Sequence, residues 1–320
     1  MPPKYSIIVP VYNRPQELEE LLRSLTDQTV KDFEVVIVED GSEVTSDKIV
    51  ADFSSHLSIQ YFSKTNSGPG PSRNEGFKKA LGQYFVVFDS DCIIPTSYFE
   101  SVEKYLAANP LDAWGGPDKG HEKFTPLQRA MAFTMSSFLT TGGIRGGKEV
   151  GFQPRSFNMG LSRAVIEKTG GFKFDRLAED IELSIRMRKE GFRVALIPDA
   201  YVYHKRRTSL LQFYSQVEGF GRGRVRVGKI HEGFVKITHW FPTMFLIGLP
   251  VTVLAFIFNQ QLGVVAVAFY LIYLLGIFID ALRMTKSFSI ALLSIPSALV
   301  QLIGYGVGFL KEKFGTSNRT

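Results

Sequence analysis

Two carboxylates one residue apart, Asp89 and Asp91, directly follow the apolar run Gln83–Phe88, which is typical of a buried strand. Carboxylates at this spacing can face one divalent cation, and hard cations such as Mg²⁺ or Mn²⁺ take oxygen ligands and commonly bridge to a diphosphate. Asp40 follows a second apolar run, Phe33–Val38, and a carboxylate at a strand end can accept hydrogen bonds from a base or a ribose. Capping of the next helix is the alternative role for Asp40. The placement of these acids predicts a metal and nucleotide site.

Four further side chains are suited to catalysis or to ligand binding. Arg73 follows a loop rich in Gly and Pro and could hold a phosphate, or be an exposed turn arginine. Glu179 and Asp180 open a predicted helix, where the macrodipole stabilises a carboxylate, and an ionised Asp beside a hydroxyl can act as a general base. The alternative is the ordinary preference for acidic residues in a first helical turn. His204 is a candidate metal or phosphate ligand, although it also begins a juxtamembrane basic run.

Several common catalytic signatures are missing from the sequence. It has no G-x-S-x-G elbow, no G-x-x-x-x-G-K-[ST] loop and no G-x-G-x-x-G after the first strand. Their absence counts against a hydrolase, a P-loop nucleotidase and a dinucleotide-dependent enzyme.

The elements that would position these residues alternate between strand and helix. The predicted strands are Tyr5–Val11, Phe33–Val38, Leu57–Phe62 and Gln83–Phe88. Helices are predicted between them, and a later helix is predicted over about 177–190. Short strands alternating with helices indicate a doubly wound, Rossmann-like α/β sheet, whose ligands bind at the carboxyl ends of the strands. Asn13, Asp40 and the Asp89/Asp91 pair all follow such strand ends.

The charge distribution separates a polar part of the chain from an apolar tail. Residues 241–310 hold three charged side chains, against 61 in residues 1–240. Three apolar spans in the tail are long enough to cross a hydrocarbon core of about 30 Å, and they cover residues 241–258, 262–279 and 288–310. We therefore expect a catalytic domain over 1–205, a basic juxtamembrane segment over 206–240, transmembrane helices over 241–310 and a tail over 311–320.

The stretch before the first span is strongly basic. Residues 204–236 carry eight Lys and Arg against two Glu, which matches the positive-inside rule and attraction to anionic headgroups. We predict an interfacial amphipathic helix over 208–232. Because the basic residues gather at the membrane boundary, no nucleic-acid partner is expected. Cys92 is the only cysteine and no signal peptide is evident, so the catalytic domain is expected to face the cytoplasm from the inner (cytoplasmic) membrane.

The carboxyl end leaves one question open. Three crossings would place Lys311, Lys313 and Arg319 outside, which the positive-inside rule disfavours. Either the third segment does not fully cross, with a break near Pro296, or the rule is violated. Gly304-x-x-x-Gly308 could pack a helix pair, but small residues are common in such segments and we attach no role to it.

Taken together, these residues resemble a family 2 glycosyltransferase with a GT-A catalytic domain, over about residues 4–205. The matching motifs, in order along the chain, are Ile7–Asn13, Val38–Ser42, Asn66–Asn74, Phe88–Asp91 and Glu179-Asp180. Membership of this family would imply a nucleotide-diphosphate sugar donor and inversion at the anomeric carbon.

The resemblance also implies individual roles. Asp180 would be the general base, with Glu179 beside it, and Asp91 would hold Mn²⁺ or Mg²⁺, with Asp89 and His204 as further ligands. The implied donor-binding residues are Pro10, Tyr12, Asn13, Asp40, Arg73 and Asp89. The implied acceptor-binding residues are Asn158, Met159 and Gly160.

The expected partners are a nucleotide-diphosphate sugar, most simply a UDP-sugar, a lipid-linked or glycan acceptor, and membrane lipids. Processive synthases of the family carry Gln-x-x-Arg-Trp, which the nearest stretch, 216–220, does not match, and three short spans make a poor export channel. We therefore expect transfer of a single sugar. One alternative is a polyprenyl-phosphate sugar synthase, whose phosphate acceptor needs no general base. Another is a catalytically silent membrane scaffold with the same fold.

Overall fold

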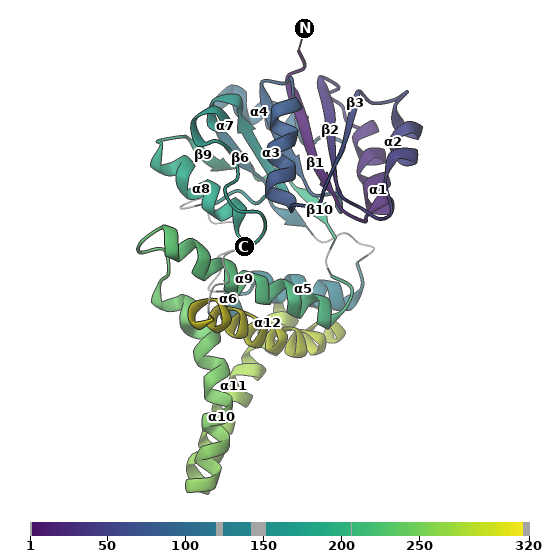
Figure 1. Ribbon diagram of the computed structural model, residues 1–320. Helices are drawn as coiled ribbons and strands as arrows, with labels where there is room; N and C mark the ends of the chain where they lie inside the picture. The colour runs from purple at the N-terminus through teal and green to yellow at the C-terminus, as the bar shows by residue number, and fades with distance from the viewer. Residues whose placement is uncertain (1, 120–123, 142–151, 206, 316–320) are drawn as a thin grey trace. The chain divides into compact units, whose positions relative to one another are not determined.

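The computed structural model describes residues 2–119, 124–141, 152–205 and 207–315 (Figure 1). These residues group into two compact units, and each has its own hydrophobic core. The first unit contains the strands β1 (Tyr5–Val11), β2 (Phe33–Asp40), β3 (Ile59–Lys64), β4 (Tyr84–Phe88), β5 (Cys92–Ile93), β6 (Ala113–Gly115), β7 (Asp118–Lys119), β8 (Asn158–Ser162), β9 (Val194–Leu196) and β10 (Val202–His204). Its helices are α1 (Pro15–Thr26), α2 (Asp47–Phe53), α3 (Pro69–Lys79), α4 (Tyr98–Ala108), α7 (Arg163–Thr169) and α8 (Glu179–Lys189).

The main sheet has seven strands in the order β3-β2-β1-β4-β8-β6-β9. The first four in this order are mutually parallel, so their carboxyl ends lie at one edge of the sheet. β8 runs antiparallel to β4, which puts Asn158 opposite Phe88 at that same edge. The observed α/β sheet confirms the predicted fold class, while the antiparallel β8 is a feature that the sequence pattern does not indicate.

Helices cover both faces of this sheet. Successive residues of a strand point to opposite sides, and in β1 both sets are apolar and pack against helices. Ile7 of β1 packs in a cluster with Leu21 of α1 and Phe99 of α4. Its neighbour Ile8 packs in a second cluster with Phe77 of α3 and with residues of α7 and α8. Burial on both faces explains why the parallel strands are continuous apolar runs rather than alternating ones.

A second, three-stranded sheet has the order β5-β10-β7. β10 pairs antiparallel with β5, and this register sets His204 opposite Cys92. The pairing carries the end of β10 to the turn that follows β4, although the two segments are more than a hundred residues apart in sequence. His204 is thereby placed next to Asp91.

The second unit is helical and contains α5 (Pro126–Ser136), α6 (Phe138–Thr141), α9 (Leu210–Ile230), the 3₁₀ helix η1 (Ile237–Trp240), α10 (Phe241–Phe258), α11 (Gln260–Thr285) and α12 (Phe288–Phe314). The expected 1–205 segment is therefore interrupted, since α5 and α6 group with the later helices. The reason is apolar packing: Met131 and Met135 of α5 share a cluster with Phe213 and Val217 of α9.

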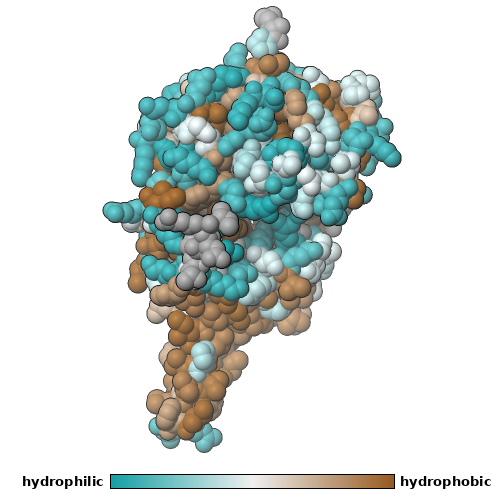
Figure 2. All heavy atoms as spheres, viewed as in Figure 1, coloured by the Kyte–Doolittle hydropathy of each residue, from teal (hydrophilic) through white to brown (hydrophobic). Residues whose placement is uncertain are grey.

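Three helices of this unit are long and apolar enough to cross a membrane: Ile237–Phe258, Gln260–Thr285 and Phe288–Phe314. The prediction of three apolar carboxyl-terminal helices is confirmed, and two of them extend beyond the predicted 262–279 and 288–310 into polar flanks. Figure 2 shows hydrophobic residues gathered over the α10–α11 hairpin. The predicted helix over 208–232 is observed as α9.

Candidate active site

The loop after β1 is tied to the loop after β2 through Asn13. The Asn13 backbone has a φ of +52°, and its Oδ1 accepts a hydrogen bond from the backbone N of Glu43 at 2.8 Å. The Asn13 backbone N donates in turn to Ser42 Oγ at 2.8 Å. This anchoring leaves Tyr12 49% exposed, so its ring is available to stack on a planar base. Pro10 is half-buried within β1.

Asp40 organises the loop between β3 and α3. Its carboxylate is buried and accepts hydrogen bonds from the backbone N of Ser67 (2.9 Å) and of Gly68 (2.8 Å) and from the Lys64 ammonium. Burial opposes ionisation of Asp40, but these hydrogen bonds outweigh it and lower the pKa of the carboxyl. Gly68 has a φ of +98°, and a Cβ there would lie 2.7 Å from the Asp175 carbonyl. Asp40 therefore shapes this loop, instead of offering a free carboxylate to a base.

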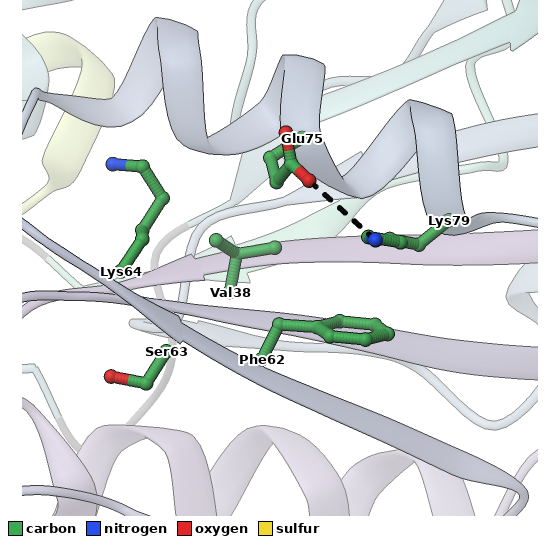
Figure 3. A pocket seen from close by; sticks show the side chains of 6 residues that line it. All are labelled: Val38, Phe62, Ser63, Lys64, Glu75 and Lys79. Carbon is green, nitrogen blue, oxygen red and sulfur yellow. Dashed lines mark ion pairs between the residues drawn. The ribbon is translucent and has the colours of Figure 1, made fainter.

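Lys64 also lines a pocket formed by β2, β3 and α3 (Figure 3). The other lining residues are Val38, Phe62, Ser63, Glu75 and Lys79. Glu75 and Lys79, one turn apart on α3, form an ion pair at 3.9 Å along one side of it. The residues that line this pocket differ from the predicted site residues, which gather at the carboxyl edge of the sheet.

Arg73 joins the end of β4 to the start of α8. Its side chain is buried, with one Nη 2.7 Å from Asp89 Oδ1 and the other 2.8 Å from Glu179 Oε1. The guanidinium thus already has two carboxylate partners and is not presented to a phosphate in this arrangement. Asp89, predicted both as a donor contact and as a metal ligand, is turned toward Arg73. Arg73 is accordingly suited to positioning these acids.

Glu179 is the more deeply buried of the two predicted catalytic acids. Burial raises the pKa of Glu179 to about 7, against the attraction of Arg73, and the neighbouring Asp180 charge adds to the rise. Arg73 stays charged, because its two acidic partners, Asp89 and Glu179, raise the pKa of its guanidinium. Glu179 has only one cation beside it, Arg73, and the negative charge of Asp180 opposes its ionisation. This position suits a structural acid better than a group that meets the substrate.

Asp180 follows Glu179 at the same helix start and is partly buried, with 14% of its side chain exposed. Its Oδ2 accepts a hydrogen bond from the backbone N of Ser156 at 3.4 Å and is 3.8 Å from an Arg155 Nη. The chain enters α8 through Leu177 and Ala178, whose φ values are +21° and +66°. Strained backbone of this kind persists only where the surrounding structure holds it, and it is concentrated at functional sites.

Asp91 and His204 form a second group of paired side chains, separate from Arg73, Asp89 and Glu179. Asp91 Oδ1 lies 3.1 Å from His204 Nε2, and the His204 ring stacks on Phe157 with centroids 4.7 Å apart. Phe157 directly follows Ser156, whose backbone N contacts Asp180. The short segment 156–157 therefore links the helix start that bears Asp180 to the Asp91–His204 pair.

The donor atoms of this cluster lie close enough together to hold one metal ion. One ligand atom from each of Asp91, Cys92 and His204 lies within 4.8 Å of the others. Within the part of the chain that the structure describes, buried His204 Nδ1 has no hydrogen-bond partner. Burial raises the pKa of the Cys92 thiol well above its ordinary value, so the sulfur stays protonated. The carboxylate and the imidazole are the two groups of this cluster that remain as ligands for a divalent cation.

Arg14 is a member of the site that the sequence motifs do not indicate. Its guanidinium forms an ion pair with Asp91 Oδ2, while Asp91 Oδ1 faces His204. The available signal is its position, directly after Asn13 at the carboxyl end of β1.

The three predicted acceptor-binding residues lie inside the main sheet. Asn158 is fully buried, accepts a hydrogen bond from Tyr98 OH at 2.6 Å and donates to the Ala200 carbonyl at 2.8 Å. Met159 is also fully buried, and a Cβ on Gly160 would lie 1.9 Å from the Trp114 ring. Their burial does not support direct contact with an acceptor.

Comparison with known proteins identifies related sequences. Residues 6–170 match the model of glycosyl transferase family 2, and residues 154–280 match that of glycosyl transferase family group 2. An uncharacterized glycosyltransferase of Rickettsia conorii is 38% identical over 106 residues, which cover 33% of this chain and 18% of the relative. EpsJ, an uncharacterized glycosyltransferase of Bacillus subtilis, is 27% identical over 221 residues, which cover 66% of this chain and 64% of EpsJ. The chain thus spans less than two thirds of either relative.

Solved structures share the fold. The mannosyltransferase PcManGT of Pyrobaculum calidifontis, in complex with GDP-Man and Mn²⁺, aligns with a TM-score of 0.63 at 17% identity, over 99% of this chain and 89% of that one. TarS of S. aureus, residues 1–349 with UDP-GlcNAc, aligns with a TM-score of 0.51 at 18% identity, over 99% of this chain and 93% of that one. Because the family model covers more than half of the sequence, the chain belongs to glycosyl transferase family 2.

Proposed function

We propose that this chain is a membrane-anchored inverting glycosyltransferase that moves one sugar from a nucleotide-diphosphate sugar to a hydroxyl of a lipid-linked or cell-envelope glycan. The observation that carries the proposal is the link, through Ser156 and Phe157, between Asp180 and the Asp91–His204 pair. A candidate base and a candidate cation site thereby meet in one site at the edge where a doubly wound sheet binds ligands.

The proposed chemistry divides between these two groups. Asp91 and His204 would hold a Mn²⁺ or Mg²⁺ ion, and a bound ion would supply positive charge to offset the charge that develops on the leaving diphosphate. Asp180 accepts the proton of the acceptor hydroxyl while that oxygen attacks the anomeric carbon. The bond from this carbon to the diphosphate breaks on the opposite face, so the configuration inverts. Glu179 is held by Arg73 and fixes the start of α8, from which Asp180 projects.

The proposed donor is a UDP-sugar, bound along the loop that contains Tyr12 and Asn13. The exposed Tyr12 ring offers a stacking surface for the base, and Asn13 fixes the loop beneath it. Asp40 acts on the donor indirectly, through the loop it organises. Two proteins of the same fold were solved with nucleotide sugars, PcManGT with GDP-Man and TarS with UDP-GlcNAc, which supports a donor of this class.

The proposed location is the cytoplasmic membrane, with the first unit facing the cytoplasm. Support comes from the apolar helices and from the basic residues of α9, which directly precede them. Transfer of a single sugar, rather than polymer extrusion, is proposed because residues 216–220 lack the motif of the processive synthases.

Donor turnover by the purified full chain in detergent tests the proposal. Release of nucleotide diphosphate is measured across UDP-, GDP- and dTDP-sugars with Mn²⁺ or Mg²⁺, for the wild type, for Asp91→Ala and for Asp52→Ala, an exposed carboxylate on α2. We expect release with one donor that EDTA and Asp91→Ala abolish and Asp52→Ala preserves. If no donor turns over, calorimetry decides: metal-dependent binding of a nucleotide sugar means that the acceptor is missing, and no binding refutes the proposal.

A further inference from the structure

The third apolar helix, α12, differs from the other two in how much of it is covered by protein. In the most apolar stretch of each candidate span, 17% of the residues are buried in Ile237–Phe258 and 11% in α11, against 50% in α12. The buried residues of α12 include the polar side chains of Ser294, Ser297 and Gln301. A helix that crosses lipid beside only two neighbours keeps most of its apolar surface outward, as α10 and α11 do. α12 instead has the burial of a helix within a protein layer.

α12 lies directly against α9. A Cβ on Gly308 would be 2.0 Å from the Glu218 carbonyl, and one on Gly304 would be 2.7 Å from Val217. From the other side, a Cβ on Gly221 would be 2.1 Å from the Tyr305 carbonyl. The glycines at 304 and 308, to which the sequence pattern assigned no role, thus bring two helix backbones into contact.

The basic residues of α9 hold the carboxyl end of α12. Glu312 lies 3.3 Å from Arg222, 3.6 Å from Arg226 and 3.2 Å from Lys229. Lys311 pairs with Glu218 at 2.9 Å. A helix this rich in Arg and Lys does not enter the hydrocarbon core, because charged side chains there are costly. The last turns of α12 are therefore at the membrane surface.

The amino-terminal half of α12 is held by α5. Ala291 and Ala298 share a cluster with Phe133, and Ser137, just beyond α5, donates to Asp280 near the end of α11 at 2.8 Å. Both α5 and α9 come before the first candidate span in the sequence, and the described residues between them contain no candidate span. Both halves of α12 are thus bound to segments on one side of the membrane.

We propose that α12 lies in the membrane interface beside α5 and α9, that only α10 and α11 cross the bilayer, and that the carboxyl end of α12 is on the same side as the amino terminus. Figure 1 draws α12 alongside α9 and α5 and across the line of the α10–α11 hairpin. This topology puts Lys311 and Lys313 on the side of the basic α9 residues, in agreement with the positive-inside rule that three crossings would break. The proposal does not depend on which reaction the site performs.

Single-cysteine labelling tests this topology on the full chain. Cys92 is buried, so a maleimide that cannot cross membranes has no exposed thiol to modify in the wild type. Three variants add one thiol each: Ser55→Cys on the first unit, Gln261→Cys at the hairpin turn and Ser317→Cys after α12. Each is labelled in intact cells and in inside-out vesicles, and complete labelling in detergent shows that each thiol can react.

We expect the cysteines at 55 and 317 to be labelled in the same preparation and the one at 261 in the other. Labelling of position 317 together with position 261 would mean that α12 crosses, and would overturn the proposal. A failure of catalysis would leave this result unchanged, since labelling requires no turnover.

Discussion

Replacement of Glu179 by glutamine isolates the effect of a buried carboxyl on stability. The Glu179 carboxyl has an ordinary pKa of 4.5 that burial raises to about 7 in the folded protein. The folded state therefore holds this proton to higher pH than the unfolded state does. This preferential protonation stabilises the folded state. The stabilisation is fully present below pH 4.5 and is lost as the pH rises through about 7. At about 1.4 kcal/mol per pKa unit, the loss amounts to about 3 kcal/mol. Glutamine is neutral at every pH, so the Glu179→Gln variant does not lose this stability as the pH rises.

The assay is thermal unfolding in detergent, followed by intrinsic fluorescence from pH 5 to pH 8. We expect Glu179→Gln to melt close to the wild type at pH 5 and above it at pH 8. For a unit of this size, about 3 kcal/mol corresponds to a difference of roughly 6–12 °C. The matched control is Glu167→Gln, an exposed carboxylate on α7, which should follow the wild type at both pH values. A Glu179→Gln variant that is less stable than the wild type at pH 8, by a margin that grows with pH, would refute the reasoning. It would mean that the Arg73 ion pair stabilises the ionised form.

Three further predictions concern the cation site and the sheet. Arg14→Ala removes a competing cation, and we expect Mn²⁺ to bind about fivefold tighter by calorimetry, from about 1 kcal/mol for a part-exposed ion pair; weaker binding would contradict this. His204→Ala should weaken Mn²⁺ binding at least about tenfold, whereas Asp89→Ala, whose carboxylate faces away toward an arginine, should change it less; equal losses would contradict this geometry. Gly160→Ala forces a Cβ into the Trp114 ring and should destabilise the protein by about 1–3 kcal/mol, seen as a lower melting temperature; an unchanged melting temperature would contradict it.

Much of the first unit follows from local sequence pattern. The β-branched run Tyr5–Val11 forms β1 at the predicted bounds, because a strand buried on both faces needs a continuous apolar run. The acidic helix start predicted near residue 177 begins at Glu179. In each case the deciding signal lies within about a dozen residues.

Features that depend on residues far away in the sequence could not be predicted from local pattern. Arg73 resembles an exposed loop arginine in sequence, and its burial depends on Asp89 and on Glu179, 106 residues away. His204 reaches Asp91 only through the β5–β10 pairing, which no local pattern encodes. Asn158 resembles a motif residue but is the first residue of an antiparallel strand inside the sheet.

The same holds for the membrane region. Length and hydropathy make α12 equivalent to α10 and α11 in sequence. Its difference arises from tertiary packing against α5 and α9, and the spacing of Gly304 and Gly308 becomes informative only once the partner helix is known.

The most direct test of the proposed catalysis is the rate of sugar transfer by Asp180→Asn in native membranes, where the acceptor is present. Incorporation of labelled sugar from the donor is followed for the wild type, for Asp180→Asn and for the exposed control Asp52→Asn, with donor binding measured in parallel. We predict that Asp180→Asn lowers the rate about 10²–10⁴-fold, the typical share of a general base, while donor binding is retained. A rate within about threefold of the control would contradict Asp180 as the base and would favour a phosphate acceptor, which needs none.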